Sequence, residues 1–377
     1  MRLLDAETLE PTEFYGEDIP PYAILSHTWS KGEEITLQEL LLVCGKPGQT
    51  DIDAAGKRVL AKKGYLKVKK AADRAREEKQ VSGSLKWIWV DTCCIDKTNS
   101  AELSEAINSM YVWYKRSAIC YVFLADVAGN GRGGENDLQL RRSKWFTRGW
   151  TLQELIAPAK INFFARDGTL LGQKSGNEDF SQLLSDITGI GVNVLARSIM
   201  PAGLSIATRM QWAARRETTR PEDMAYCLLG LFGVNMPLLY GEGASRAFLR
   251  LQEQIIQTTC DDQSIFAWTL EDDKPDSLHG LLARSPADFS RSGKIEAFVG
   301  ASIHASAPSA MTSHGLHVQL HLEPLRTFRP RDADPDRKNG GFRKNKVARK
   351  DRRIREAIGW FSSDRSQYTT CSPIFKS

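Results

Sequence analysis

The chain has 377 residues, enough for two domains of ordinary size, and its 41% hydrophobic and 26% charged residues are typical of a globular protein. The net charge of +5 arises in one segment, 326–355, where 13 Lys and Arg and 4 Asp and Glu give +9. Because the remaining residues carry −4, the composition excludes a broadly basic surface and predicts no specific nucleic-acid partner.

The sequence shows no targeting or metal-binding signal. Its start, MRLLDAETLEPTEF, lacks the basic flank and apolar run of a secretory signal, and about 18 consecutive apolar residues occur nowhere. We therefore expect a cytoplasmic protein with no transmembrane segment. The seven cysteines are scattered and odd in number, which predicts reduced thiols. No CxxC pair occurs, and five of the six histidines follow residue 278, so we expect neither a bound metal nor a cofactor.

Two short apolar runs, 22–25 (YAIL) and 87–90 (WIWV), predict buried strands. The charged segment 51–79 between them predicts an amphipathic helix with a solvated basic face. Polar, charged or aromatic side chains that suit a binding site follow each run: Ser26, His27, Trp29, Asp91, Cys93 and Asp96.

Further helices and strands alternate with these runs. Apolar residues at three- or four-residue spacing after Asn99 predict a helix, and residues 119–124 and 160–165 predict a third and a fourth strand. Such alternation favours an α/β fold, with a parallel sheet flanked by helices as in flavodoxin-like proteins. Ligands of these sheets bind beyond the carboxyl ends of the strands, where the polar groups lie. The strand order does not follow from the sequence.

The segment 145–158 (WFTRGWTLQELIAP) predicts a helix that Pro158 ends. Apolar residues at core spacing lie on one face, and Trp150 and Glu154, four residues apart, lie together on the opposite face. An indole that displaces water beside a carboxylate raises its pKa, and raised carboxylates are common at catalytic sites. The alternative interpretation is a half-exposed helix with a Trp anchor and a solvated Glu.

A change of pattern near residue 170 divides the chain. Residues 1–170 form the predicted α/β domain, and residues 171–262 predict a helical subdomain. Within it, Thr219 and Glu222 predict a capping box for a helix that ends at Gly233.

The last third of the chain has a weaker pattern. Residues 263–325 mix short apolar pieces with Gly, Pro and Ser and predict a β-rich extension, with strands at 296–299 and 316–322. Residues 326–377 are basic and begin with a stretch almost without apolar side chains, so we expect a mobile tail.

Two other site types have weaker support. The glycines of segment 129–134 match GxGxxG, but polar residues follow and favour a loop over a dinucleotide site, and no P-loop occurs. Cys93 or Cys94 with His27 and Asp91 supplies the groups of a thiol catalytic site, but adjacent cysteines are more often small buried residues. Glu154 offers a different chemistry, since a lone carboxylate can bind a ribose hydroxyl and stabilise an oxocarbenium-like centre.

Three blocks of the sequence resemble the signature blocks of the fungal heterokaryon incompatibility (HET) domain: YAILSHTW (22–29), WIWVDTCCIDK and the following helix and strand (87–127), and WFTRGWTLQELIAP (145–158). The resemblance continues through the helical region to about residue 270. It implies a fungal protein of nonself recognition and regulated cell death.

HET domains are also distantly similar to the TIR domains of immune signalling, several of which cleave NAD with one glutamate on a helix after the third strand. WTLQEL resembles their WCxxEL pattern, which implies that Glu154 matches the glutamate and Trp150 the aromatic residue, whereas Thr151 replaces a common Cys.

Two hypotheses follow from the resemblance. In the first, the protein is an NAD-cleaving effector in which Glu154 is catalytic. In the second, it is a noncatalytic module that signals by protein assembly. Both imply self-association or another signalling protein as partner, with NAD as a candidate substrate. The residues expected to bind substrate are Ser26, His27, Trp29, Asp91, Cys93, Asp96, Arg148 and Trp150.

Overall fold

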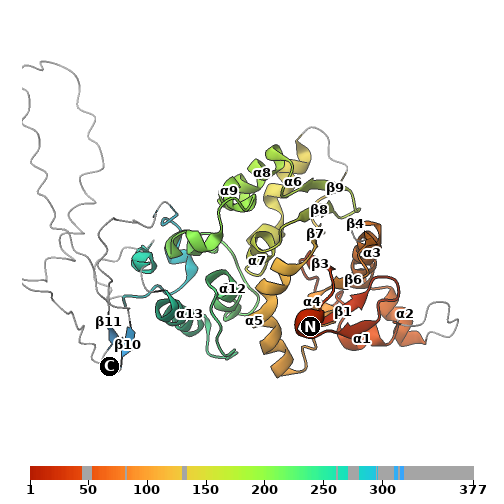
Figure 1. Ribbon diagram of the computed structural model, residues 1–377, viewed down its shortest axis with the longest axis horizontal. Helices are drawn as coiled ribbons and strands as arrows, with labels where there is room; N and C mark the ends of the chain where they lie inside the picture. The colour runs from red at the N-terminus through yellow and green to blue at the C-terminus, as the bar shows by residue number, and fades with distance from the viewer. Residues whose placement is uncertain are drawn as a thin grey trace, which may run out of the picture. The chain divides into compact units, whose positions relative to one another are not determined.

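A computed structural model describes most of the first 295 residues and two short segments beyond them (Figure 1). The described ranges are 1–44, 53–80, 83–129, 134–259, 262–270, 280–293, 295, 310–312 and 315–317. The chain divides into two units, Met1–His304 and Ala305–Ser377. The described part of the second unit is an antiparallel pair of strands, β10 (Ala310–Thr312) and β11 (Gly315–His317).

A seven-stranded sheet lies at the centre of the first unit. Its strands are β1 (Arg2–Asp5), β2 (Pro11–Glu13), β3 (Tyr22–His27), β6 (Trp87–Trp89), β7 (Ile119–Leu124), β8 (Ile161–Ala165) and β9 (Leu170–Gln173), in the order β2-β1-β6-β3-β7-β8-β9. A separate ribbon joins β4 (Lys79–Gln80) to β5 (Gly83–Ser84).

The central strands β6, β3, β7 and β8 are parallel, whereas β1, β2 and β9 pair in antiparallel fashion, with β2 and β9 at the two edges. Numbered along the chain, the four parallel strands have the order 2-1-3-4 of flavodoxin-like sheets. The predicted α/β fold is therefore confirmed. Every residue of β3 and β7 is buried, as expected for apolar strands covered on both faces.

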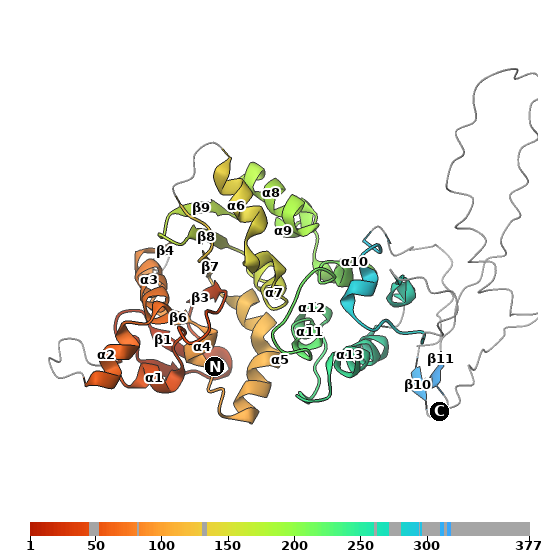
Figure 2. The ribbon, with the colours of Figure 1, turned by 180° about the vertical axis from the view of Figure 1, so that it is seen from behind.

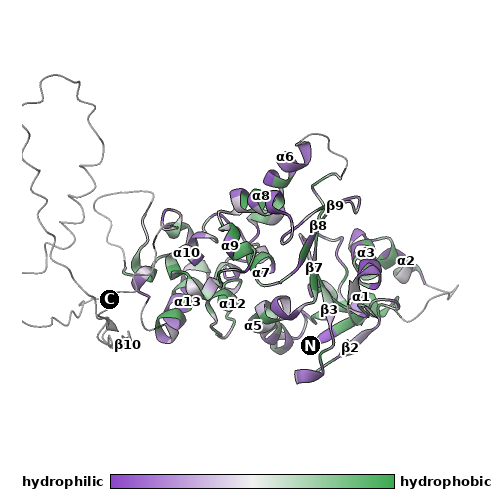
Figure 3. Cartoon of the chain, turned by 45° about the horizontal axis from the view of Figure 1, so that its top comes forward, coloured by the Kyte–Doolittle hydropathy of each residue, from purple (hydrophilic) through white to green (hydrophobic). Residues whose placement is uncertain are grey.

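Helices cover both faces of this sheet. Figures 1 and 2 show α3 on one face and α5 and α7 on the other. The helices of this part are α1 (Leu37–Leu41), α2 (Ala54–Leu60), α3 (Lys63–Glu77), α4 (Asp91–Cys94), α5 (Ser100–Arg116), α6 (Glu135–Arg142) and α7 (Thr151–Ile156). The sequence leaves Asn99 or Ser100 as the cap of α5, and the structure shows that Asn99 caps it through its side chain. Hydrophobic residues concentrate in the central strands, whereas α6 is largely hydrophilic (Figure 3).

A helical region follows β9 and packs against α5. Its helices are α8 (Glu178–Thr188), α9 (Val192–Leu195), α10 (Ile206–Gln211), α11 (Asp223–Tyr226), α12 (Leu229–Phe232) and α13 (Ala244–Thr258). The contact between α12 and α5 is close at Gly230, where an added Cβ would lie 2.0 Å from Tyr111 Cβ. A glycine is therefore required for this packing.

The predicted helix over 145–158 is wrong in its first half. Lys144–Thr147 forms a 3-10 turn, and the α-helix begins only at Thr151. The Gly149 amide donates to the Glu217 carbonyl at 2.8 Å, and the Glu217 amide donates to the Thr147 carbonyl at 2.7 Å. The backbone here pairs with the helical region, so it is not available for helical hydrogen bonds.

The predicted capping box and single helix up to Gly233 are also wrong. Glu222 is the N-cap of α11 but makes no capping bond through its side chain. The chain forms two short helices because the Leu228 amide bonds three residues back, to Ala225, which interrupts the α-helical pattern. Gly233 ends α12 in the left-handed conformation, as predicted.

Other predictions are partly covered by the described residues. Segment 51–79 contains two helices, α2 and α3. Strand β11 overlaps the predicted strand 316–322, whereas segment 296–299 and the tail 326–377 lie outside the described residues. The sheet and helical region belong to one compact unit, and the domain boundary near residue 170 stays a prediction.

The described ranges contain no helix that combines the length and apolar character needed to cross a membrane. Within the same ranges, His, Cys, Asp and Glu side chains form no group of three or more that could hold a metal ion. Five cysteines lie within the described residues, and none of them forms a disulfide there: Cys44, Cys93, Cys94, Cys120 and Cys227.

Candidate functional site

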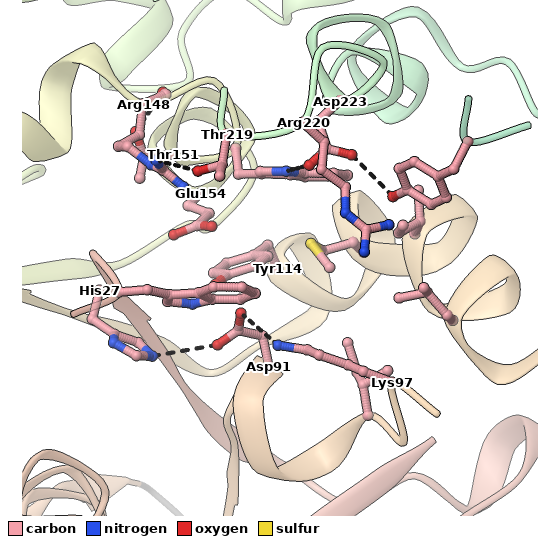
Figure 4. Close-up of a pocket in the computed structure, with 17 residues that line it drawn as sticks. His27, Asp91, Lys97, Tyr114, Arg148, Thr151, Glu154, Thr219, Arg220 and Asp223 are labelled. Carbon is pink, nitrogen blue, oxygen red and sulfur yellow. Dashed lines mark hydrogen bonds and ion pairs between the residues drawn. The ribbon is translucent and has the colours of Figure 1, made fainter. Parts of the chain in front are cut away.

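A cavity of about 240 Å³ lies at the carboxyl ends of β3 and β6, beside the point where the strand order reverses. The α/β part, the α7 segment and the helical region each supply part of its wall (Figure 4). The α/β part contributes His27, Trp29, Asp91, Ile95, Lys97, Leu103, Ile107, Met110 and Tyr114. Helix α7 and the turn before it contribute Arg148, Trp150, Thr151 and Glu154. The helical region contributes Thr219, Arg220, Asp223 and Tyr240.

Glu154 points from α7 toward the cavity, although only 8% of its surface is exposed. The Ser26 hydroxyl donates a hydrogen bond to Glu154 Oε2, and Trp145 Nε1 donates to Ser26 Oγ at 2.8 Å. Burial disfavours the charged carboxylate and raises the pKa of Glu154 to about 8, although the Ser26 hydrogen bond acts in the opposite direction. The side chain therefore holds a proton at neutral pH.

Asp91 follows β6 and differs from Glu154 in its charge. Its carboxylate lies 3.3 Å from His27 Nε2 and 3.9 Å from Lys97 Nζ. Burial opposes ionisation of Asp91, but Lys97 and His27 outweigh it and lower the pKa to about 2. A lysine ammonium can only donate, so Lys67, 2.8 Å from His27 Nδ1, places the ring proton on Nε2, toward Asp91. Asp91 is thus ionised in the same cavity in which Glu154 is protonated.

Both predicted tryptophans line the cavity. Trp29 is 52% exposed, and Lys97 Nζ lies 3.7 Å from its ring centroid. Trp150 Nε1 donates to Asp223 Oδ2 at 3.1 Å, so its polar edge is bound to the helical region. The alternative of a solvated Glu154 is wrong, because the helical region and the end of β3 cover this face of α7.

Three predicted site residues do not line the cavity. Ser26 is buried behind Glu154. Cys93 Sγ lies 3.6 Å from the Ile35 carbonyl, and burial raises the pKa of its thiol to about 12, which argues against a nucleophilic thiolate. Asp96 accepts hydrogen bonds from Thr98 and Gln38 outside the cavity. The other predicted residues, His27, Trp29, Asp91, Arg148, Trp150 and Glu154, are brought together there.

Several residues of the cavity were not predicted from the sequence. The polar ones are Lys97, Tyr114, Thr151, Thr219, Arg220, Asp223 and Tyr240. Lys97 is the last residue of the block WIWVDTCCIDK, so its place in the block was an available signal. The residues of the helical region follow no periodicity that points to a site, and only the folded chain brings them to α7.

Arg216 attaches the helical region to the N-terminal end of α7. Its buried guanidinium donates from Nη1 to the Arg148 carbonyl at 2.8 Å and to Thr151 Oγ1 at 2.9 Å. Burial lowers the pKa of Arg216 to about 10. Because these bonds lie in the turn that begins α7, they restrict the orientation in which Glu154 faces the cavity.

Lys174 holds the other end of α7. Its fully buried Nζ donates to the Leu155 carbonyl at 3.0 Å and to the Pro158 carbonyl at 2.5 Å, and burial lowers the pKa of Lys174 to about 7. Carbonyls at a helix C-terminus lack partners within the helix, so an N–H donor there satisfies them. Both ends of the short helix that carries Glu154 are therefore fixed by buried basic side chains.

Comparison with known proteins identifies relatives for two parts of the chain. Residues 22–138 match the family described as heterokaryon incompatibility protein (HET), and residues 246–279 match a domain of unknown function (DUF8212). The vegetative incompatibility protein HET-E-1 of Podospora anserina is 44% identical over 264 residues, which are 68% of this chain. The chain spans only 18% of that relative's length. No solved structure matches the chain.

Proposed function

Because this chain is a heterokaryon incompatibility (HET) domain protein, we propose that it acts in fungal nonself recognition as a cell-death effector that hydrolyses NAD. The name of its relative, a vegetative incompatibility protein, supports the biological role. The observation that carries the chemical proposal is the position of Glu154. It lines the same cavity as two indoles and an ionised Asp91, at the carboxyl end of a parallel sheet.

Hydrolysis of the nicotinamide glycosidic bond requires stabilisation of positive charge on the ribose. As the bond from C1′ to the ring nitrogen breaks, its electron pair neutralises the pyridinium cation, and positive charge develops at C1′. Water then adds its hydroxyl to C1′ and releases a proton, which gives nicotinamide and ADP-ribose. The leaving group needs no proton, and a carboxylate beside the ribose stabilises the oxocarbenium-like transition state.

The side chains of the cavity suit this reaction. Glu154 has to be ionised in the reactive complex, and a cationic pyridinium ring beside it favours that form. The ionised Asp91 adds a second negative group, and Trp29 and Trp150 offer planar surfaces to the nicotinamide ring. The volume of about 240 Å³ is below the ~300–1,000 Å³ of common ligand sites, so it suits the nicotinamide ribose end rather than the whole dinucleotide.

The test is release of nicotinamide from NAD by the purified protein, followed by chromatography. We expect the Glu154→Gln variant to lose activity by about 100-fold or more, which is the usual effect of removing a group that stabilises transition-state charge. Glu135→Gln is the matched control, because Glu135 is an exposed glutamate on α6 away from the cavity. This control should keep the activity of the unmodified protein.

Self-association or a signalling partner belongs to the same proposal, so the assay is repeated after fusion to an oligomerising module, with light scattering to establish the assembly state. If nicotinamide appears in neither state, or appears at the same rate with Glu154→Gln, the catalytic proposal is wrong. That result would favour the hypothesis of a noncatalytic assembly module.

A further inference from the structure

Two guanidinium groups line the cavity and have no part in the proposed bond cleavage. Arg148 precedes α7, and Arg220 belongs to the helical region. Among the described residues, no carboxylate forms an ion pair with either group, whereas the third cation of the cavity, Lys97, is paired with Asp91. The cavity therefore has two positive charges available for an anionic part of a ligand.

Both guanidinium groups are held in place by contacts that leave donors free. Arg148 Nη1 donates to Thr219 Oγ1 at 3.0 Å. The Arg220 guanidinium lies over the Tyr240 ring, with Cζ 4.3 Å from the centroid, and the Tyr240 hydroxyl is fixed by a 2.9 Å hydrogen bond to Asp223 Oδ1. Each guanidinium has five N–H donors, so most of them stay available in a restrained orientation.

The segment Thr219–Arg220 brings the two groups to one part of the cavity. Thr219 holds Arg148 directly, and its neighbour in the chain is Arg220, whose side chain points toward the cavity in Figure 4. Arg220 is also exposed, so it lies where the cavity opens to solvent. A ligand bound with its reactive end at Glu154 and extending toward the cavity opening would lie beside both guanidinium groups.

We propose that Arg148 and Arg220 bind the diphosphate of the substrate and so select a dinucleotide over nicotinamide riboside. Guanidinium groups match phosphate oxygens with paired hydrogen bonds, and two of them balance the two charges of a diphosphate. This inference rests on the proposed function and deepens it. It also assigns substrate selection to two residues outside the segment 22–138 that matches the HET family, one of which, Arg220, belongs to the helical region.

Calorimetric titration of the Glu154→Gln protein tests the inference without turnover. The probes are NAD, nicotinamide riboside, which lacks phosphate, and inorganic pyrophosphate. We expect Arg220→Gln and Arg148→Gln, each added to this protein, to weaken NAD and pyrophosphate binding by about tenfold or more, the range for hydrogen bonds to charged groups. The affinity for nicotinamide riboside should change less than about twofold. Added salt should weaken NAD binding less in both variants.

Arg142→Gln is the matched control, since it removes the same charge from an exposed position on α6. Equal losses for NAD and nicotinamide riboside, or pyrophosphate binding that does not depend on the two arginines, would overturn the inference. If pyrophosphate binding depends on both arginines but NAD is never cleaved, the anion site stands and the proposed function fails. If NAD is cleaved and neither variant changes the selectivity for NAD over nicotinamide riboside, the proposed function stands and the diphosphate site fails.

Discussion

The Ser26 hydroxyl donates a hydrogen bond to Oε2 of Glu154, a residue 128 positions later in the sequence. Trp145 Nε1 donates to the same Ser26 oxygen at 2.8 Å, which directs the hydroxyl proton toward Glu154. The contact joins the carboxyl end of β3 to α7 inside the core. The Ser26 hydrogen bond also favours the ionised form of Glu154, although burial outweighs it.

Replacing Ser26 by Ala should raise the pKa of Glu154 further, because the lost hydrogen bond favours the charged form. Trp145 Nε1 also loses its buried partner, so the free energy of unfolding should fall by about 1–3 kcal/mol. Urea denaturation measures the change. Ser30→Ala is the control, because Ser30 is exposed and its replacement should leave the free energy of unfolding unchanged. Equal free energies of unfolding for the two variants would mean that the Ser26 contact does not stabilise the fold.

The stability of the protein should depend on pH through Glu154. Its pKa is about 8 in the folded state and 4.5 when unperturbed, so the folded state holds more protons between these values. The contribution of Glu154 to the free energy of unfolding is therefore at its full value below pH 4.5, and it is lost as the pH rises to about 8. Between these two pH values, the free energy of unfolding should fall by up to about 1.4 kcal/mol per pH unit.

Glu154→Gln should remove that contribution. Urea denaturation across pH 5–8 should give a flatter dependence for Glu154→Gln than for the unmodified protein, with Glu135→Gln retaining the original slope. Parallel curves for all three proteins would show that the Glu154 carboxyl titrates normally in the folded state.

The pH dependence of NAD cleavage provides a separate prediction. If the ionised Glu154 stabilises the ribosyl cation, kcat/KM should increase with pH and level off above about 8, the pKa of Glu154 before substrate binds. The midpoint for kcat should be lower, because the bound pyridinium cation favours the carboxylate. A kcat/KM that is instead level below pH 8 and decreases above it would identify Glu154 as a proton donor.

Arg216→Met should destabilise the attachment of the helical region to α7. The substitution keeps much of the buried volume but leaves the Arg148 carbonyl and Thr151 Oγ1 without this donor. We expect the free energy of unfolding to fall by about 2–4 kcal/mol, the sum expected for unpaired buried acceptors. Arg215→Met is a matched control because Arg215 is the exposed neighbour. Equal Tm values for the two variants in thermal unfolding would contradict the structural role of Arg216.

The sequence by itself determined the parallel core and the position of its polar ends. The runs 22–25, 87–90, 119–124 and 160–165 all became strands, because short, mainly apolar segments suit a parallel sheet that is covered on both faces. The strand order followed only from the structure, as did the antiparallel strands β1, β2 and β9, which are short and lack a strong pattern.

The tertiary structure decided the chemistry of the site. Spacing placed Glu154 on a helix near the strand ends, but its raised pKa depends on burial, which side chains distant in sequence produce together. Ser26 binds Glu154 from β3, and Arg220 reaches the cavity from the helical region. Periodicity reports which face of an element is buried, whereas desolvation and charge pairing depend on which other elements cover that face.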